Sequence, residues 1–168
     1  MKKFILLYWF NLALLFTLFY WDISPLGDIL NHLQTDMTAY IVSLTLNDGI
    51  TKGYEIIINN HYSLVIEKAC NGMVPYLFFL SSIIAFPSTI LDKIKWSIIG
   101  YTVITTINIF RIWLVAKLVL DEVGNFSLAH DFIGNSILIF VVLTLFILFI
   151  KTKKGLIHES NKILSKRQ

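Results

Sequence analysis

Four stretches of the chain are apolar enough and long enough to cross a membrane as helices. They cover residues 4–21, 73–91, 96–120 and 133–150. Crossing ~30 Å of hydrocarbon takes about 20 helical residues. The pattern therefore predicts an all-α membrane protein with about four transmembrane helices. The first stretch is longer than the ~7–15 apolar residues of a secretory signal and lacks a cleavage site of the A-x-A type, which indicates a retained anchor.

The segment 29–46 has a different pattern, with its apolar residues on one helical face and its polar residues elsewhere. The apolar set is Ile29, Leu30, Leu33, Met37, Tyr40, Ile41 and Leu44, and the polar set is Asn31, Gln34, Thr35, Thr38 and Thr45. A one-sided pattern of this kind favours an amphipathic helix that lies in the membrane interface over one that crosses the bilayer.

Between these helices the chain changes to residues typical of β-strands. Two such runs, 54–58 and 62–67, flank Asn59-Asn60-His61. Asparagine tolerates the positive φ that tight hairpin turns require. The sequence thus predicts a short extracytoplasmic β-hairpin that leads directly into the residues before the second apolar stretch.

The distribution of charge predicts the orientation in the membrane. Ten of the fourteen basic residues fall on one side of a four-span topology: Lys2, Lys3, Lys93, Lys95, Lys151, Lys153, Lys154, Lys162, Lys166 and Arg167. Basic residues gather on the cytoplasmic side of membrane proteins. We therefore expect both termini to be cytoplasmic, with residues 1–150 forming one membrane domain and 151–168 a basic cytoplasmic tail. The net charge of +3 is explained by this distribution, so we expect no nucleic-acid partner.

Composition narrows the chemistry. The chain is 56% hydrophobic and 15% charged, against about 25% charged in soluble domains. A single cysteine excludes an internal disulfide. The four histidines are far apart and lack the spacing of metal ligands, so the sequence predicts neither a metal site nor a cofactor.

The single cysteine, Cys70, lies just before the second apolar stretch. Asn71 is a plausible cap for the helix that follows, and Pro75 is tolerated in a first helical turn. A thiol beside a helix N-terminus is favoured in its thiolate form, which makes it more reactive. The alternative is that Cys70 is only a small buried apolar residue.

Two further residues have the chemistry of a site. Arg111 lies within the third stretch, where a charge normally faces a partner or a wet cavity, and Asn108 shares its helical face. His130 lies at the mouth of the fourth stretch, with Gly134 four residues later on the same face. Alternatively, Arg111 snorkels or joins two helices, and His130 is an interfacial polar residue.

Taken together, the three side chains come from three spans and point to one reaction. A thiol attacks a carbonyl, an imidazole accepts the thiol proton and returns it to the leaving amine, and a cation stabilises the oxyanion. These are the groups that cysteine acyl transfer requires.

The motifs "EKACNG", "NIFRI" and "HDFIG", in this order, resemble the exosortase/archaeosortase family, and most closely the short single-domain exosortase H-like type. The resemblance covers residues 67–134, the catalytic core of the family. It implies catalytic roles for Cys70, Arg111 and His130. Its supporting motif residues are Glu67, Asn71, Gly72, Asn108 and Gly134.

The resemblance also implies a function and a location. The expected activity is that of a membrane cysteine protease or transpeptidase in the plasma (inner) membrane, with its active site facing outward. Its expected partners are exported proteins with a C-terminal sorting signal, composed of a motif, a transmembrane helix and a basic cluster, and a lipid or glycan acceptor.

Two other functions stay open on the sequence. A non-catalytic membrane assembly protein would use Arg111 as an intramembrane pairing charge. A proton or anion conduit would use an intramembrane arginine with a nearby histidine, but the chain lacks acidic residues within the predicted spans and internal repeats.

Overall fold

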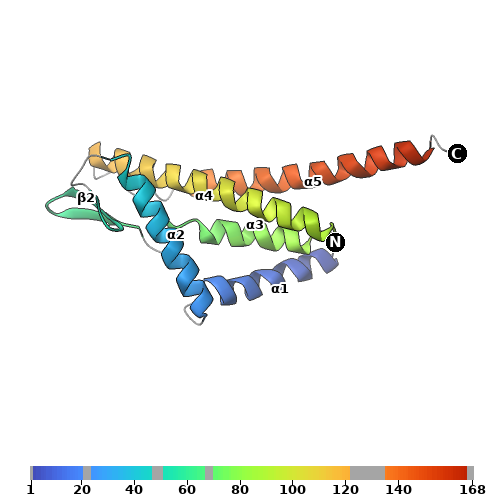
Figure 1. Cartoon of the computed structure of the whole chain (residues 1–168), viewed down its shortest axis with the longest axis horizontal. Helices are drawn as coiled ribbons and strands as arrows, with labels where there is room; N and C mark the ends of the chain where they lie inside the picture. The colour runs from blue at the N-terminus through green and yellow to red at the C-terminus, as the bar shows by residue number, and fades with distance from the viewer. Residues whose placement is uncertain (1, 21–23, 47–50, 67–69, 122–134, 166–168) are drawn as a thin grey trace.

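The computed structural model describes residues 2–20, 24–46, 51–66, 70–121 and 135–165. Its elements are α1 (Lys2–Phe19), α2 (Pro25–Ser43), β1 (Thr51–Lys52), β2 (Glu55–Asn59), β3 (Tyr62–Val65), α3 (Met73–Ala85), α4 (Ile90–Asp121) and α5 (Asn135–Ser165). Helices α1, α3, α4 and α5 run lengthwise through the molecule, whereas α2 crosses them obliquely near the end that carries the strands (Figure 1).

Helix α3 is the centre of the bundle, because α1, α4 and α5 all pack against it. One core cluster joins Phe79 and Ile83 of α3 to Ile104 of α4 and Phe149 of α5. Gly100 allows α4 to approach closely, since a Cβ at this position would lie 1.9 Å from Cε1 of Phe79.

Three helices among the described residues are long and apolar enough to span a membrane: Lys2–Phe19, Ile90–Val119 and Asn135–Thr152. The protein is therefore an integral membrane protein, but the predicted count of four spans is not confirmed. The stretch predicted at 73–91 forms a helix of 13 residues, about 20 Å long at 1.5 Å per residue. It ends at Ala85 because Pro87 disfavours helical geometry at the residue before it, and Phe86 is extended, with φ −76° and ψ 136°.

The helix predicted over 29–46 is present as α2, and its position in the membrane interface stays a prediction. It begins at Pro25, which is favoured in a first helical turn, and the Ser24 side chain accepts a hydrogen bond from the Gly27 N–H at 3.5 Å. The polar residues Asn31, Gln34 and Thr38 are buried. Most of the large apolar side chains of this helix are exposed, namely Leu26, Ile29, Leu33, Met37 and Tyr40. The amphipathic pattern thus identified the helix, but its polar side packs on the protein.

The predicted hairpin is confirmed as strands β2 and β3, and the shorter β1 adds a third antiparallel strand. The turn between β2 and β3 does not use the positive φ expected for asparagine. Among the described residues, positive φ occurs only at Gly53, between β1 and β2, and at Gly72. Ile56 and Ile66 pack the sheet on Val42 of α2 and Ile112 of α4.

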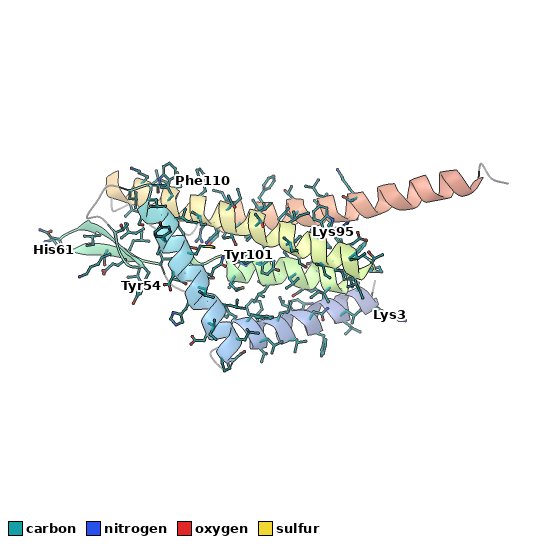
Figure 2. The ribbon with its side chains drawn as sticks, viewed as in Figure 1. Lys3, Tyr54, His61, Lys95, Tyr101 and Phe110 are labelled. Atoms are coloured by element: carbon teal, nitrogen blue, oxygen red, sulfur yellow. The ribbon has the colours of Figure 1, made fainter. Side chains whose placement is uncertain are left out.

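The two ends of the molecule differ in chemistry. The end that carries β1–β3 is the sheet end, where Tyr54 and His61 lie (Figure 2). Lys3 and Lys95 lie toward the opposite end, the lysine end (Figure 2). The centroids of the Trp96 and Phe149 rings are 5.7 Å apart. Lys151, two residues beyond Phe149, therefore lies near the level of Lys95 along the bundle. Helix α5 continues into the predicted tail as far as Ser165.

Candidate active site

The Cys70 loop, residues 70–72, lies directly before α3. Gly72 is the residue that precedes the helix, and its left-handed geometry (φ 82°, ψ 0°) favours glycine. The predicted cap, Asn71, is not the cap residue itself, but its Oδ1 accepts a hydrogen bond of 2.9 Å from the Met73 N–H. Pro75 lies in the first helical turn, as predicted.

A buried residue of α4 holds this loop. The side-chain amide of Asn108 donates a hydrogen bond of 2.8 Å to the backbone carbonyl of Cys70. Its Oδ1 accepts a hydrogen bond of 3.2 Å from Nη1 of Arg111. Asn108, which the sequence placed on the helical face of Arg111, therefore bonds to this arginine and also to the cysteine backbone.

The structure brings two of the three predicted catalytic residues together. Cys70, which is half-buried, and Arg111, which is 3% exposed, line the same small cavity of ≈ 10 Å³. A space of this size is at the lower limit for a single water molecule. The other lining residues, which include Ile66 and Ile112, are apolar, so Cys70 and Arg111 share surroundings of low polarity.

Arg111 also reaches the start of α5. Its Nη2 donates a hydrogen bond of 3.3 Å to Oδ1 of Asn135, a residue that sequence reasoning did not select. Asn135 directly follows Gly134 of the "HDFIG" motif. The predicted site residues His130, Gly134 and Glu67 lie outside the described residues, and their roles stay predictions.

Behind the loop lies a buried polar network that sequence reasoning also missed. Gln34 Nε2 donates to the Asn71 carbonyl at 3.0 Å and to Thr105 Oγ1 at 3.1 Å, and its Oε1 accepts from the Tyr101 hydroxyl.

The neighbouring asparagines extend this network. Asn71 Nδ2 donates to Asn31 Oδ1 at 3.0 Å, and Asn31 Nδ2 donates to the Phe19 and Gly27 carbonyls at 2.8 and 2.7 Å. Hydrogen bonds thus offset the burial of the Gln34, Asn71 and Asn31 side chains. The sequence did contain a sign of this network, because the polar residues of α2 recur on one helical face.

Comparison with known proteins identifies the family. The family model described as transmembrane exosortase (Exosortase_EpsH) matches residues 2–149, which is most of the chain. The chain belongs to the transmembrane exosortase family. Comparison with curated proteins and with solved structures finds no significant match.

In this exosortase, α3 separates two grooves. The Arg111 groove (≈ 600 Å³) is lined by Tyr8, Gly72, Val74, Pro75, Phe78, Ser82, Arg111, Asn135, Leu138, Ile139, Val142, Leu143 and Phe146. The Gln34 groove (≈ 370 Å³) is lined by Phe19, Leu30, Leu33, Gln34, Met37, Met73, Tyr76, Leu77, Leu80 and Tyr101. Gly72 borders the first groove and Met73 the second, so both approach the start of α3, directly after Cys70.

Proposed function

We propose that this exosortase is a membrane cysteine transpeptidase or endopeptidase that cleaves the C-terminal sorting signal of exported proteins. The signal has a recognition motif, a transmembrane helix and a basic cluster. The enzyme transfers the cleaved protein to a surface or lipid acceptor. The observation that carries the proposal is the meeting of Cys70 and Arg111 in one cavity, linked through Asn108.

In the first half of the reaction, the Cys70 sulfur attacks the scissile carbonyl carbon while His130 accepts the thiol proton. The carbonyl oxygen becomes an oxyanion, and Arg111 stabilises it. The C–N bond then breaks, His130 gives its proton to the leaving amine, and the exported protein remains bound as a thioester to Cys70.

In the second half, an amine or hydroxyl of the acceptor attacks the thioester carbonyl and gives its proton to His130. The C–S bond breaks, the new amide or ester is released, and the thiol recovers its proton. Water in place of the acceptor makes the reaction a hydrolysis. Glu67, Asn71, Gly72, Asn108 and Gly134 hold the motif geometry in this scheme.

The proposed location is the plasma (inner) membrane, with the sheet end outward and both termini in the cytoplasm. Lys3 and Lys95 lie toward the end opposite the sheet (Figure 2), and basic residues favour the cytoplasmic side. This orientation places Cys70, Arg111 and Asn135 in the outward-facing half, where an exported substrate emerges.

The test is thioester trapping with the purified chain in proteoliposomes. The probe is a tagged reporter that ends in a candidate motif, an apolar helix and an arginine-rich tail. This C-terminal segment is taken from a secreted protein whose gene lies near the gene of this chain. We expect a reporter–enzyme adduct that hydroxylamine cleaves, and no adduct with Cys70→Ala. Normal reporter cleavage by Cys70→Ala would exclude the thioester mechanism.

A second candidate function is that of a non-catalytic assembly partner, and the contact between Arg111 and Asn135 favours it. This contact joins α4 to α5, as an arginine with a purely structural role would do. The two functions differ in thiol chemistry. Rapid alkylation of Cys70 from outside at neutral pH supports the enzyme, whereas an inert thiol and a fully functional Cys70→Ser chain support the partner.

A further inference from the structure

The Arg111 groove is bounded mainly by the faces of α3 and α5, and Tyr8 of α1 and Arg111 of α4 also line it. The α5 residues that line it, from Asn135 to Phe146, recur at intervals of three and four positions, and so do Pro75, Phe78 and Ser82 of α3. Ile139 and Leu143 are 61% and 55% exposed. Rows of side chains at this spacing are what one helix presents for packing against another.

The length of the groove indicates which apolar molecule it fits. Asn135 lies sixteen residues before Lys151, or about 24 Å along the helix at 1.5 Å per residue. Phe146 lies five residues before Lys151, or about 7.5 Å. The groove therefore passes through the middle of a ~30 Å hydrocarbon core. An acyl chain from one leaflet contacts only part of this length, whereas a membrane-spanning helix contacts all of it.

The groove is continuous with the candidate active site. Gly72 and Arg111 line its end nearest the sheet, and Arg111 also lines the cavity that contains Cys70. The peptide that precedes a helix seated in this groove would therefore lie beside the guanidinium and the thiol. Arginine N–H groups donate hydrogen bonds to carbonyl oxygens, which such a peptide supplies.

The geometry points to the Arg111 groove as the docking site for the transmembrane helix of the substrate protein. This inference rests on the proposed function, and it assigns the helix to one of the two grooves. The Gln34 groove, on the other face of α3, serves as the internal control because it is also lined largely by apolar side chains.

The test is photo-crosslinking, with p-benzoylphenylalanine in place of Leu143 in the Arg111 groove or Leu33 in the Gln34 groove. Both leucines are exposed, at 55% and 62%. The chain carries Cys70→Ala, so crosslinking does not depend on catalysis. The probe is a tagged reporter with an apolar helix of about 20 residues and an arginine-rich tail. We expect at least about tenfold more crosslinked reporter from position 143 than from position 33.

Equal or stronger crosslinking from position 33, or none from either position, would overturn the inference. The inference would also fail if a phospholipid with a photoreactive acyl chain labelled position 143 and excess reporter did not reduce this labelling. If the reporter crosslinks from position 143 but the unmodified chain does not process it, the docking site is supported and the proposed function is not. Processing without crosslinking from position 143 overturns the docking site alone.

A kinetic comparison tests the same assignment in the active chain. Leu143→Trp narrows the Arg111 groove, and we expect it to raise KM for the reporter about tenfold while Cys70 alkylation by a small soluble reagent stays unchanged. Leu33→Trp should leave both unchanged. If Leu33→Trp raises KM and Leu143→Trp does not, the helix docks on the other face of α3.

Discussion

Asn108 connects the backbone of Cys70 to the guanidinium of Arg111. It donates to the Cys70 carbonyl at 2.8 Å and accepts from Arg111 Nη1 at 3.2 Å, and it is fully buried. A single side chain of α4 therefore sets the position of the cation relative to the cysteine loop. This relationship gives Asn108 a positioning role that can be tested apart from chemistry at the thiol.

We expect Asn108→Ala to lower reporter processing by about 10- to 100-fold. Buried hydrogen-bond partners left unsatisfied cost about 1–3 kcal/mol, and about 1.4 kcal/mol corresponds to a factor of ten in rate. Asn108→Asp keeps an acceptor for Arg111 but loses the donor to the Cys70 carbonyl, so it separates the two contacts. Thr106→Ala, at an exposed position of the same helix, is the control. An unchanged rate in Asn108→Ala would contradict the positioning role.

Arg111→Ala should reduce kcat/KM by about 10²–10³, the usual cost of losing one oxyanion donor. Arg111→Lys should recover only part of this, because a lysine lacks the planar fork of donors with which Arg111 contacts Asn108 and Asn135. Lys117→Ala, at an exposed position of α4, should have no effect. If Arg111→Ala lowers the amount of folded protein and leaves the rate per folded molecule unchanged, the arginine is structural.

Two glycines with positive φ provide a matched pair for stability. Gly53 has φ 61° and open space where a Cβ would lie, whereas at Gly72 (φ 82°) a Cβ would lie 3.1 Å from the Asn108 side chain. Gly53→Ala should cost about 1–2 kcal/mol, the penalty of left-handed geometry. Gly72→Ala should cost more in unfolding free energy and should also slow processing. Equal losses of unfolding free energy in the two variants would show that the contact with Asn108 is unimportant.

Gly100 and Phe79 form a close approach between α4 and α3. A Cβ on Gly100 would lie 1.9 Å from Phe79 Cε1, so we expect Gly100→Ala to destabilise the protein by about 1–3 kcal/mol through overpacking. Adding Phe79→Leu should recover part of this loss, because the smaller side chain makes room. The measurement is a double-mutant cycle of unfolding free energies in mixed micelles. Strict additivity of the two changes would contradict the contact.

The sequence motifs selected Cys70 and Arg111, which line one cavity, because a lone thiol and an intramembrane cation have few purely structural explanations in combination. The role of α2 was harder to predict. In a soluble protein the apolar side of an amphipathic helix packs inward, but a membrane solvates apolar side chains, so Asn31, Gln34 and Thr38 turn toward the protein and its hydrogen-bond partners.

The sequence also did not predict the length of α3 or the contact of Asn135 with Arg111, for local reasons. Hydropathy continues from Met73 to residue 91, but Pro87 ends the helix at Ala85. Asn135 belongs to none of the three motifs, and only the packing of α5 against α4 brings it to Arg111. His130, Gly134 and Glu67 lie outside the described residues, so the third part of the predicted site still depends on the sequence alone.

Gln34 gives the most direct test of the inward-facing polar side of α2. Gln34→Leu removes the partner of the Asn71 carbonyl, of Thr105 and of the Tyr101 hydroxyl, and we expect a loss of about 1–3 kcal/mol in unfolding free energy. Tyr101→Phe removes one of these hydrogen bonds and should cost less. Because the two variants share that bond, the double variant should lose less than the two single losses added together.

The control for these variants is Tyr40→Phe, on the outward face of the same helix, where the side chain is 65% exposed. It should change the unfolding free energy by less than about 0.5 kcal/mol, as is usual for surface substitutions. If α2 instead packed with its apolar side inward, Gln34→Leu would be neutral or stabilising and Tyr40→Phe would carry the larger cost. The sign of the difference between Gln34→Leu and Tyr40→Phe therefore determines which face of α2 contacts the Cys70 loop.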